Sequence, residues 1–167
     1  MNKINPSFRF NLNFAKYSDV VFSLLKIAGG QIIGKKKFAK LLYFYEFDFF
    51  EKYEKTSTGE TFLKYPMGPL PKNMEEIVNQ LCKNGQIKTV SQKSSNGYDI
   101  VEYKLIDNPI IKLTTEEKSI LDRIQKLYID KTGKELEDIS HLQAPWNAVE
   151  MYQVINLELS YYRATDF

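Results

Sequence analysis

Thiol and imidazole side chains are common nucleophiles and bases, and this chain has one of each, Cys82 and His141. Nucleophilic catalysis needs the two groups within hydrogen-bond reach, and a third group that orients the base. Cys82 follows Leu81 near the end of a predicted helix, without a local feature that would activate the thiol. Cysteine is often buried as a small apolar residue, so we predict that Cys82 is structural and that the chain has no catalytic residue.

The same counts limit cofactors and metals. One cysteine can form neither a disulfide within the chain nor a multi-cysteine zinc or iron–sulfur site. A lone histidine is seldom a metal site, so His141 is expected to form hydrogen bonds near a helix end. Gly29, Gly30 and Gly34 lack the spacing of a phosphate-binding loop, and no Walker, Rossmann or nucleophile-elbow motif is present. We therefore predict no cofactor and no metal, while a hydrolase built on an unrecognised carboxylate pair stays open as a third hypothesis.

Glu46 is the acidic residue whose position stands out. It lies on a predicted helix from Lys35 to about Tyr53, where its side chain projects into an apolar arc between Leu42 and Phe50. A buried carboxylate is costly unless it accepts hydrogen bonds or meets a cation. Two roles fit this position, an anchor for loop amides or a catalytic acid with a raised pKa. We interpret Glu46 as a structural acid.

The composition favours a soluble protein with an unusually high number of aromatic side chains. Phe and Tyr, with 11 residues each, supply most of the 14% aromatic content, and the formal charge is only +2. Such a charge gives no strong attraction to nucleic acid or to anionic membranes. No stretch reaches the ~20 apolar residues of a membrane span, and the first residues lack the apolar core of a signal peptide. We expect a cytoplasmic protein.

Helical spacing is clear in the first third of the chain. Apolar residues recur with helical period between Phe14 and Ala28, and Gly29-Gly30 would end this helix. In the helix from Lys35 to Tyr53, apolar residues cover most of the circumference, and the polar remainder includes Lys36, Lys37, Lys40, Asp48 and Glu51. A helix of this kind belongs in the middle of a domain or beneath a partner.

The middle of the chain contains a proline-rich segment. A short extended run from Thr61 to Tyr65 precedes Pro66-Met67-Gly68-Pro69-Leu70-Pro71, which is expected to be a rigid surface turn rather than a strand or helix. Asn73 is then expected to cap a helix whose buried stripe is Met74, Ile77, Val78 and Leu81.

The second half predicts a hairpin and further helices. Strands at 86–90 and 99–105 are predicted to pair across a turn containing Asn-Gly. Val101 and Tyr103 would lie on the buried face and Glu102 on the solvent-exposed face. Thr114 and Glu117 form a capping box for a helix that Gly133 would end. The core stripe of that helix is Ile120, Leu121, Ile124, Leu127 and Tyr128. A short helical turn near 136–141 follows. The fold class is therefore α+β, a mostly helical single domain with a small antiparallel hairpin or sheet.

Nucleic-acid binding is the main structural alternative. Two helices, a third helix and then a hairpin follow the order of a winged-helix DNA-binding regulator. Lysines 35–37 and Lys40 could contact phosphates, but a recognition helix should carry Arg, Lys, Asn or Gln toward the bases. The candidate helices present mainly Phe, Tyr and Leu or a Glu-rich first turn, and the chain has three arginines, Arg9, Arg123 and Arg163.

Several segments, taken in order, resemble the SocA-like antitoxin family, also called the Panacea domain. The first are Lys40-Leu41-Leu42-Tyr43-Phe44, Thr58-Gly59-Glu60-Thr61-Phe62 and the run from Leu63 to Asn73, which contains Tyr-Pro-Met-Gly-Pro-Leu-Pro. Ile139-Ser140-His141, Pro145-Trp146 and the run from Leu159 to Ala164 continue the resemblance. It divides the chain into an N-terminal arm, 1–13, and an antitoxin domain, 14–167.

The resemblance implies an antitoxin of a bacterial or phage toxin–antitoxin pair, which neutralises its toxin by direct binding or acts as an adaptor to a protease unfoldase. The residues predicted to bind the partner are Tyr65, Pro66, Met67, Gly68, Pro69, Leu70 and Trp146. For each of them the alternative is packing against the domain's own core. Phe and Tyr side chains that the core does not use make good interface anchors, and the same apolar surface would also allow self-association.

Overall fold

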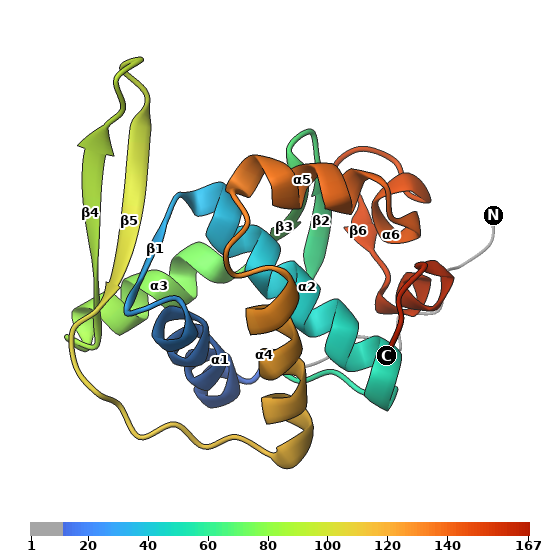
Figure 1. Cartoon of the computed structure of the whole chain (residues 1–167), viewed down its shortest axis with the longest axis horizontal. Coiled ribbons are helices and arrows are strands. Elements are labelled where there is room, and N and C mark those ends of the chain that lie inside the picture. The colour runs from blue at the N-terminus through green and yellow to red at the C-terminus, as the bar shows by residue number, and fades with distance from the viewer. Residues whose placement is uncertain (1–11) are drawn as a thin grey trace.

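The central element is helix α2 (Lys35–Tyr53), which crosses the middle of the computed structural model (Figure 1). The structure describes residues 12–167. Every residue of α2 from Phe38 to Phe50 is buried, including Lys40 and Asp48, which the helical spacing had placed on the polar side. The predicted bounds of α2 are confirmed. The polar side was wrongly predicted at Lys40 and Asp48, because other elements pack around the whole circumference of α2 between Phe38 and Phe50.

The elements around α2 give an α+β fold, as predicted. The other helices are α1 (Phe14–Ile27), α3 (Met74–Lys83), α4 (Thr115–Leu127), α5 (Gly133–His141), α6 (Ala144–Asn147) and the 3-10 helix η1 (Leu157–Tyr162). The strands are β1 (Gln31–Ile33), β2 (Phe62–Tyr65), β3 (Gly68–Pro71), β4 (Ile87–Lys93), β5 (Asp99–Leu105) and β6 (Val154–Ile155). Helix α1 ends at Ile27, and Gly29, just after its cap residue Ala28, has a φ of +82° that supports the predicted glycine stop.

The strands form two small antiparallel sheets, ordered β1-β5-β4 and β3-β2-β6. In the first sheet Ile32 faces Tyr103, and the far end of the β4–β5 hairpin projects from the body as an arm (Figure 1). The prediction that Glu102 lies on a solvent-exposed face was wrong. Glu102 is buried, and its carboxylate has two polar partners: the Lys104 ammonium group lies 3.1 Å from it, and the Gln92 side chain donates to the same oxygen.

The proline-rich segment is a strand where a turn was predicted. Only Pro66 and Met67 form the turn, and residues 68–71 pair with β2 as the edge strand β3. The N–H of Lys72 donates to the carbonyl of Thr61 at 2.8 Å, which makes 61 and 72 a hydrogen-bonded pair. Antiparallel pairs alternate, so Pro69 and Pro71 fall at positions where no N–H toward β2 is needed. An edge strand tolerates proline at such positions.

Two helix ends differ from the sequence expectation. The Thr114–Glu117 capping box of α4 is confirmed, but Leu127 of its predicted core stripe lies at the surface. Gly133 does not end α4. It is the first residue of α5, where Thr132 and Glu135 form a second capping box. Since Thr followed three residues later by Glu is the signature of a helix start, this motif could have been recognised.

The start of the described chain is tied to the core. The predicted N-terminal arm, 1–13, lies outside the described residues except for Leu12 and Asn13. Asn13 caps α1 by accepting a hydrogen bond from the N–H of Lys16, and its own N–H donates to the carbonyl of Thr58. None of the helices between residues 12 and 167 has the length and apolar character needed to cross a bilayer.

Candidate functional site

The tip of the β2–β3 hairpin brings together six of the seven residues predicted to bind a partner. Tyr65, Pro66 and Met67 are exposed, with Met67 at 60% exposure. Gly68 and Pro69 are buried, and Leu70 is half-buried against the core. The hairpin therefore divides the predicted set into three residues that could meet a partner and three that support them.

Lys40 supports the hairpin from below. Its ammonium group, on the buried side of α2, donates a hydrogen bond of 2.8 Å to the carbonyl oxygen of Pro69. Burial lowers the pKa of Lys40 to about 8, and the charge of Glu137 only partly offsets that effect. Lys40 is thus a buried cation with one direct hydrogen bond to the hairpin.

Gly68 fits this arrangement because it has no side chain. Its φ is +97°, a conformation that other residues rarely adopt. A Cβ at this position would overlap the end of the Lys40 side chain and come within 2.8 Å of Ser140 Oγ. Gly68 therefore allows α2, β3 and α5 to meet at one point.

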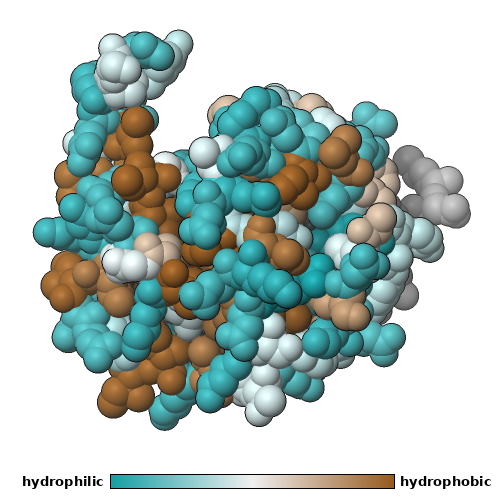
Figure 2. Space-filling model, viewed as in Figure 1, coloured by the Kyte–Doolittle hydropathy of each residue, from teal (hydrophilic) through white to brown (hydrophobic). Residues whose placement is uncertain are grey.

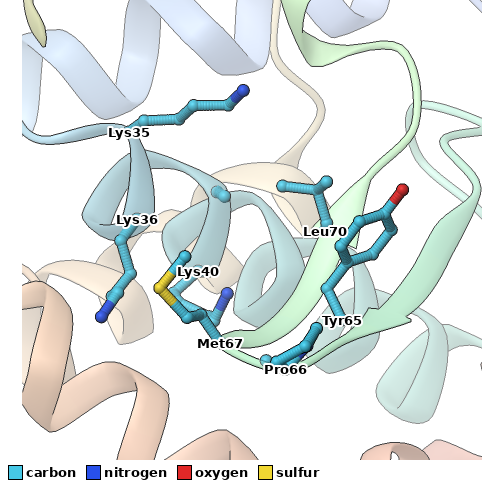
Figure 3. Close-up of a pocket in the computed structure, with 9 residues that line it drawn as sticks. Lys35, Lys36, Lys40, Tyr65, Pro66, Met67 and Leu70 are labelled. Atoms are coloured by element: carbon cyan, nitrogen blue, oxygen red, sulfur yellow. The ribbon is translucent and has the colours of Figure 1, made fainter. Parts of the chain in front are cut away.

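A pocket of about 280 Å³ lies between the hairpin tip and the first turns of α2 (Figure 3). Its wall is largely apolar, and Met67 and Tyr65 reach over it from the hairpin. The lining residues are Lys35, Lys36, Ala39, Lys40, Tyr65, Pro66, Met67, Gly68 and Leu70. All the charged residues in this set are lysines.

Trp146, the seventh predicted residue, lies behind the hairpin. It is half-buried, and its indole N–H donates to the carbonyl oxygen of Tyr65 at 3.0 Å. The Lys64 ammonium group is 4.2 Å from the indole ring centroid, and the His141 ring stacks on the indole at 4.0 Å. These contacts assign Trp146 a role in holding the hairpin tip.

The exposed surface continues onto residues that the sequence analysis did not select. Tyr152 is 60% exposed, and its ring meets the Tyr65 ring edge-on with centroids 5.3 Å apart. Val154 is also exposed, on β6 opposite Leu63. No motif marks Tyr152 or Val154, because only the pairing of β6 with β2 brings them next to the hairpin. We call Tyr65, Met67, Tyr152 and Val154 the hairpin surface.

Apolar side chains also reach the surface elsewhere, so the hairpin surface is distinguished by its support. Figure 2 shows apolar patches on the displayed face, including one where the β4–β5 arm joins the body. Ile110, before α4, is 87% exposed, and Leu142, after α5, is 85% exposed. Single exposed apolar residues are ordinary on protein surfaces. The hairpin differs because a tryptophan and a buried lysine each hold its backbone.

Glu46 has the contacts of a loop anchor. Its carboxylate accepts hydrogen bonds from the N–H groups of Ser57 and Thr58 and from the hydroxyl groups of Thr56 and Thr58. Burial raises the pKa of Glu46, and these four donors oppose the rise. The carboxylate oxygens are thus occupied by donors from one loop of the chain, as an anchor for loop amides would require.

A second buried acid, Glu60, was missed by the sequence analysis. It accepts hydrogen bonds from the Tyr17 hydroxyl at 2.6 Å, from the Thr61 N–H, and from both the N–H and side-chain amide of Asn73. Burial, followed by the charge of Glu60, raises the pKa of Tyr17. Asn73 is the N-cap residue of α3, as predicted, but its side chain forms no capping hydrogen bond because it donates to Glu60 instead.

A buried ion cluster joins the end of the described chain to α2. The Arg163 guanidinium contacts Asp48 at 2.7 Å and also binds Glu51, while Arg123 contacts Asp48 at 3.1 Å. The side chains of Arg163 and Asp48 are fully buried. Burial raises the pKa of Asp48, and the two arginines oppose that rise. Asp48 was predicted to lie on the polar side of α2, because one sequence cannot show that α4 and the tail cover it.

Cys82 and His141 both pack against neighbouring side chains. Cys82 is half-buried at the end of α3 and packs against the core. The His141 ring is engaged with Trp146, and burial lowers its pKa. Within residues 12–167, no group of three or more His, Cys, Asp or Glu residues is placed to hold a metal ion.

Comparison with known proteins gives one match. The family model described as antitoxin SocA-like, Panacea domain, matches residues 38–147. The match runs from the first turn of α2 to the end of α6. It includes the hairpin, Trp146 and the pocket lining except for Lys35 and Lys36. No curated protein and no solved structure matches the chain.

Proposed function

The chain belongs to the SocA-like antitoxin family with its Panacea domain, and from this premise we propose that it neutralises a protein toxin by binding it directly. The proposed contact is the hairpin surface. We further propose that binding takes place in the cytoplasm. No covalent chemistry is required of any residue in this mechanism.

The observation that carries the proposal is the support beneath the hairpin tip. Tyr65 and Met67 are exposed at the tip of the β2–β3 hairpin, whose backbone is held on its two strands by Trp146 and Lys40. Holding a loop in its binding conformation reduces the entropy lost when a partner binds. Rigid aromatic residues are also frequent anchors of binding energy. An exposed apolar tip that is fixed in this way is therefore suited to binding another protein.

A rescue assay tests the proposal. The protein is coexpressed with the product of each neighbouring reading frame that is toxic to its host, and growth is measured. Met67→Asp should abolish rescue without changing the melting temperature, because Met67 is exposed and forms no hydrogen bond through its side chain. Leu70→Asp is a poorer test, because Leu70 packs against the core and its loss would also destabilise the fold.

The matched control is Ile110→Asp, which places the same charge at an exposed apolar position before α4. This variant should rescue growth as well as the native protein does. If Met67→Asp also rescues fully while binding the toxin, the hairpin surface is not the contact.

Direct occlusion and delivery to a protease predict different fates for the toxin. If binding alone neutralises the toxin, its level stays constant in the presence of the antitoxin. If the antitoxin is an adaptor, the toxin disappears with time and accumulates when the host's protease unfoldases are deleted. A pulse-chase measurement of toxin half-life separates the two. We propose occlusion as the basic mechanism and degradation as its regulated extension.

DNA binding is the second candidate, and one observation favours it. Apart from the inserted β2–β3 hairpin, the order α1, β1, α2, α3, β4, β5, with β5 between β1 and β4, is that of a winged-helix domain. The exposed side of α3 opposes phosphate contact, because Glu75 and Glu76 lie in its first turn. A gel shift with a steep salt dependence would support this candidate over toxin binding.

A further inference from the structure

The pocket beside the hairpin surface indicates the chemistry of the segment that it receives. Its volume, about 280 Å³, is at the lower limit of roughly 300–1,000 Å³ for small-molecule sites. Its wall is largely apolar, with Met67, Leu70 and Ala39 among the lining residues. A space of this size and character fits an apolar side chain of a partner better than it fits a cofactor.

The charges around the pocket are of one sign. Lys35, Lys36 and Lys40 contribute to its lining, and no carboxylate does. Lys40 is already bonded to Pro69, and Lys36 pairs with the buried acid Glu137. Lys35 pairs with Glu75, whose side chain is 70% exposed. An exposed ion pair contributes little, so a carboxylate from outside can replace Glu75 at Lys35.

From this combination we infer that the pocket binds an acidic, apolar segment of the partner, with an apolar side chain inserted beside Met67 and an adjacent carboxylate paired with Lys35. This inference rests on the proposed function and specifies the chemistry of the partner. The carboxylate would set the position of the segment and increase its association rate, while burial of the apolar side chain would supply most of the affinity.

The experiment uses two synthetic peptides in place of the toxin. One is acetyl-Gly-Glu-Leu-Glu-Phe-Glu-Gly-amide, and the other has Lys in place of each Glu. Binding is measured with methyl-labelled methionine by NMR titration of the whole chain. The acidic peptide should bind at least about tenfold more tightly than the basic one. It should shift the Met67 methyl signal and leave the signal of Met74, buried at the start of α3, unchanged.

Charge variants identify the cation. Lys35→Glu should weaken binding of the acidic peptide at least about tenfold, and Lys35→Gln should give a smaller loss. The matched control is Lys88→Glu, at an exposed position on β4, which should change neither peptide's affinity. Melting curves of all three variants verify that each is folded.

Two results would overturn the inference, namely equal or absent binding of the two peptides, or an unchanged affinity in Lys35→Glu. These results are separable from failure of the proposed function. If Met67→Asp abolishes toxin rescue while the peptides show no charge preference, the proposal of toxin binding at the hairpin is supported. The inference that the partner segment is acidic is then wrong.

Discussion

The Lys40 ammonium group and the Pro69 carbonyl oxygen are joined by a hydrogen bond of 2.8 Å, between a buried residue of α2 and the edge strand β3. A buried charge is costly, and this one has a carbonyl as its direct partner. Residues at the protein's centre and at its surface are therefore coupled through a single side chain. The stability of the core and the shape of the hairpin should respond together when this contact changes.

The first prediction concerns pH. The pKa of Lys40 is about 8 in the folded state and 10.5 ordinarily. Below pH 8 Lys40 is protonated in both the folded and the unfolded protein, so folding carries the full cost of burying its charge. Between pH 8 and 10.5 the unfolded state binds more protons, so this group makes stability rise with pH. The whole change is about 3 kcal/mol.

Lys40→Met isolates this effect, because other titrating groups are the same in both proteins. The free energy of unfolding is measured with urea at pH 7.5 and at pH 10.5. From the lower to the higher pH it should rise by about 3 kcal/mol more in the native protein than in the variant. A difference between the two proteins that does not vary with pH would show that Lys40 titrates normally.

The second prediction concerns Gly68. Gly68→Ala should destabilise the protein by about 2–5 kcal/mol, from backbone strain together with overlap of the new methyl group with Lys40. Gly97→Ala is the matched control, since Gly97 also has a positive φ of +79° but open space around its Cβ position. The control should cost about 1–2 kcal/mol. Equal losses in urea denaturation would mean that the packing over Lys40 contributes nothing.

The third prediction concerns Glu46. Glu46→Gln should destabilise the protein by about 1–3 kcal/mol, because the new amide N–H donors would face the backbone N–H groups of Ser57 or Thr58, which cannot accept a hydrogen bond. Glu76→Gln, at an exposed position on α3, should have little effect. Partner affinity at a temperature where both variants are folded should be unchanged. A loss of affinity in Glu46→Gln with native stability would instead indicate a functional acid.

The fourth prediction concerns the ion cluster at the tail. Arg163→Met should destabilise the protein by about 3–5 kcal/mol, because it leaves Asp48 buried with only Arg123 as a cationic partner. Lys134→Met removes a cation from an exposed pair with Asp138 and should leave the stability almost unchanged. Thermal and urea unfolding of the two variants give the comparison. Similar losses would show that the Arg163 pairing is as weak as a surface one.

The sequence was sufficient for features set by local patterns. The bounds of α2, the capping box at Thr114 and the glycine stop after α1 follow from spacing and cap chemistry, and the structure has all three. The α+β class followed in the same way. The placement of Glu46 in an apolar arc was also visible, since helical spacing alone puts it between Leu42 and Phe50.

Features that depend on contacts distant in sequence were not predictable. The burial of Asp48 follows from Arg163, 115 residues later, and the exposure of Tyr152 beside Tyr65 follows from the pairing of β6 with β2. The prolines of β3 were read as turn residues because proline usually disfavours strands. Only the register shows that their positions need no N–H toward β2.

Those prolines also have a consequence for colloidal behaviour. Because Pro69 and Pro71 have no amide hydrogen, the outer side of β3 lacks the donors that an incoming strand would bind there. An incoming strand can therefore form fewer backbone hydrogen bonds along this edge, which disfavours edge-to-edge growth of fibrils by the folded protein.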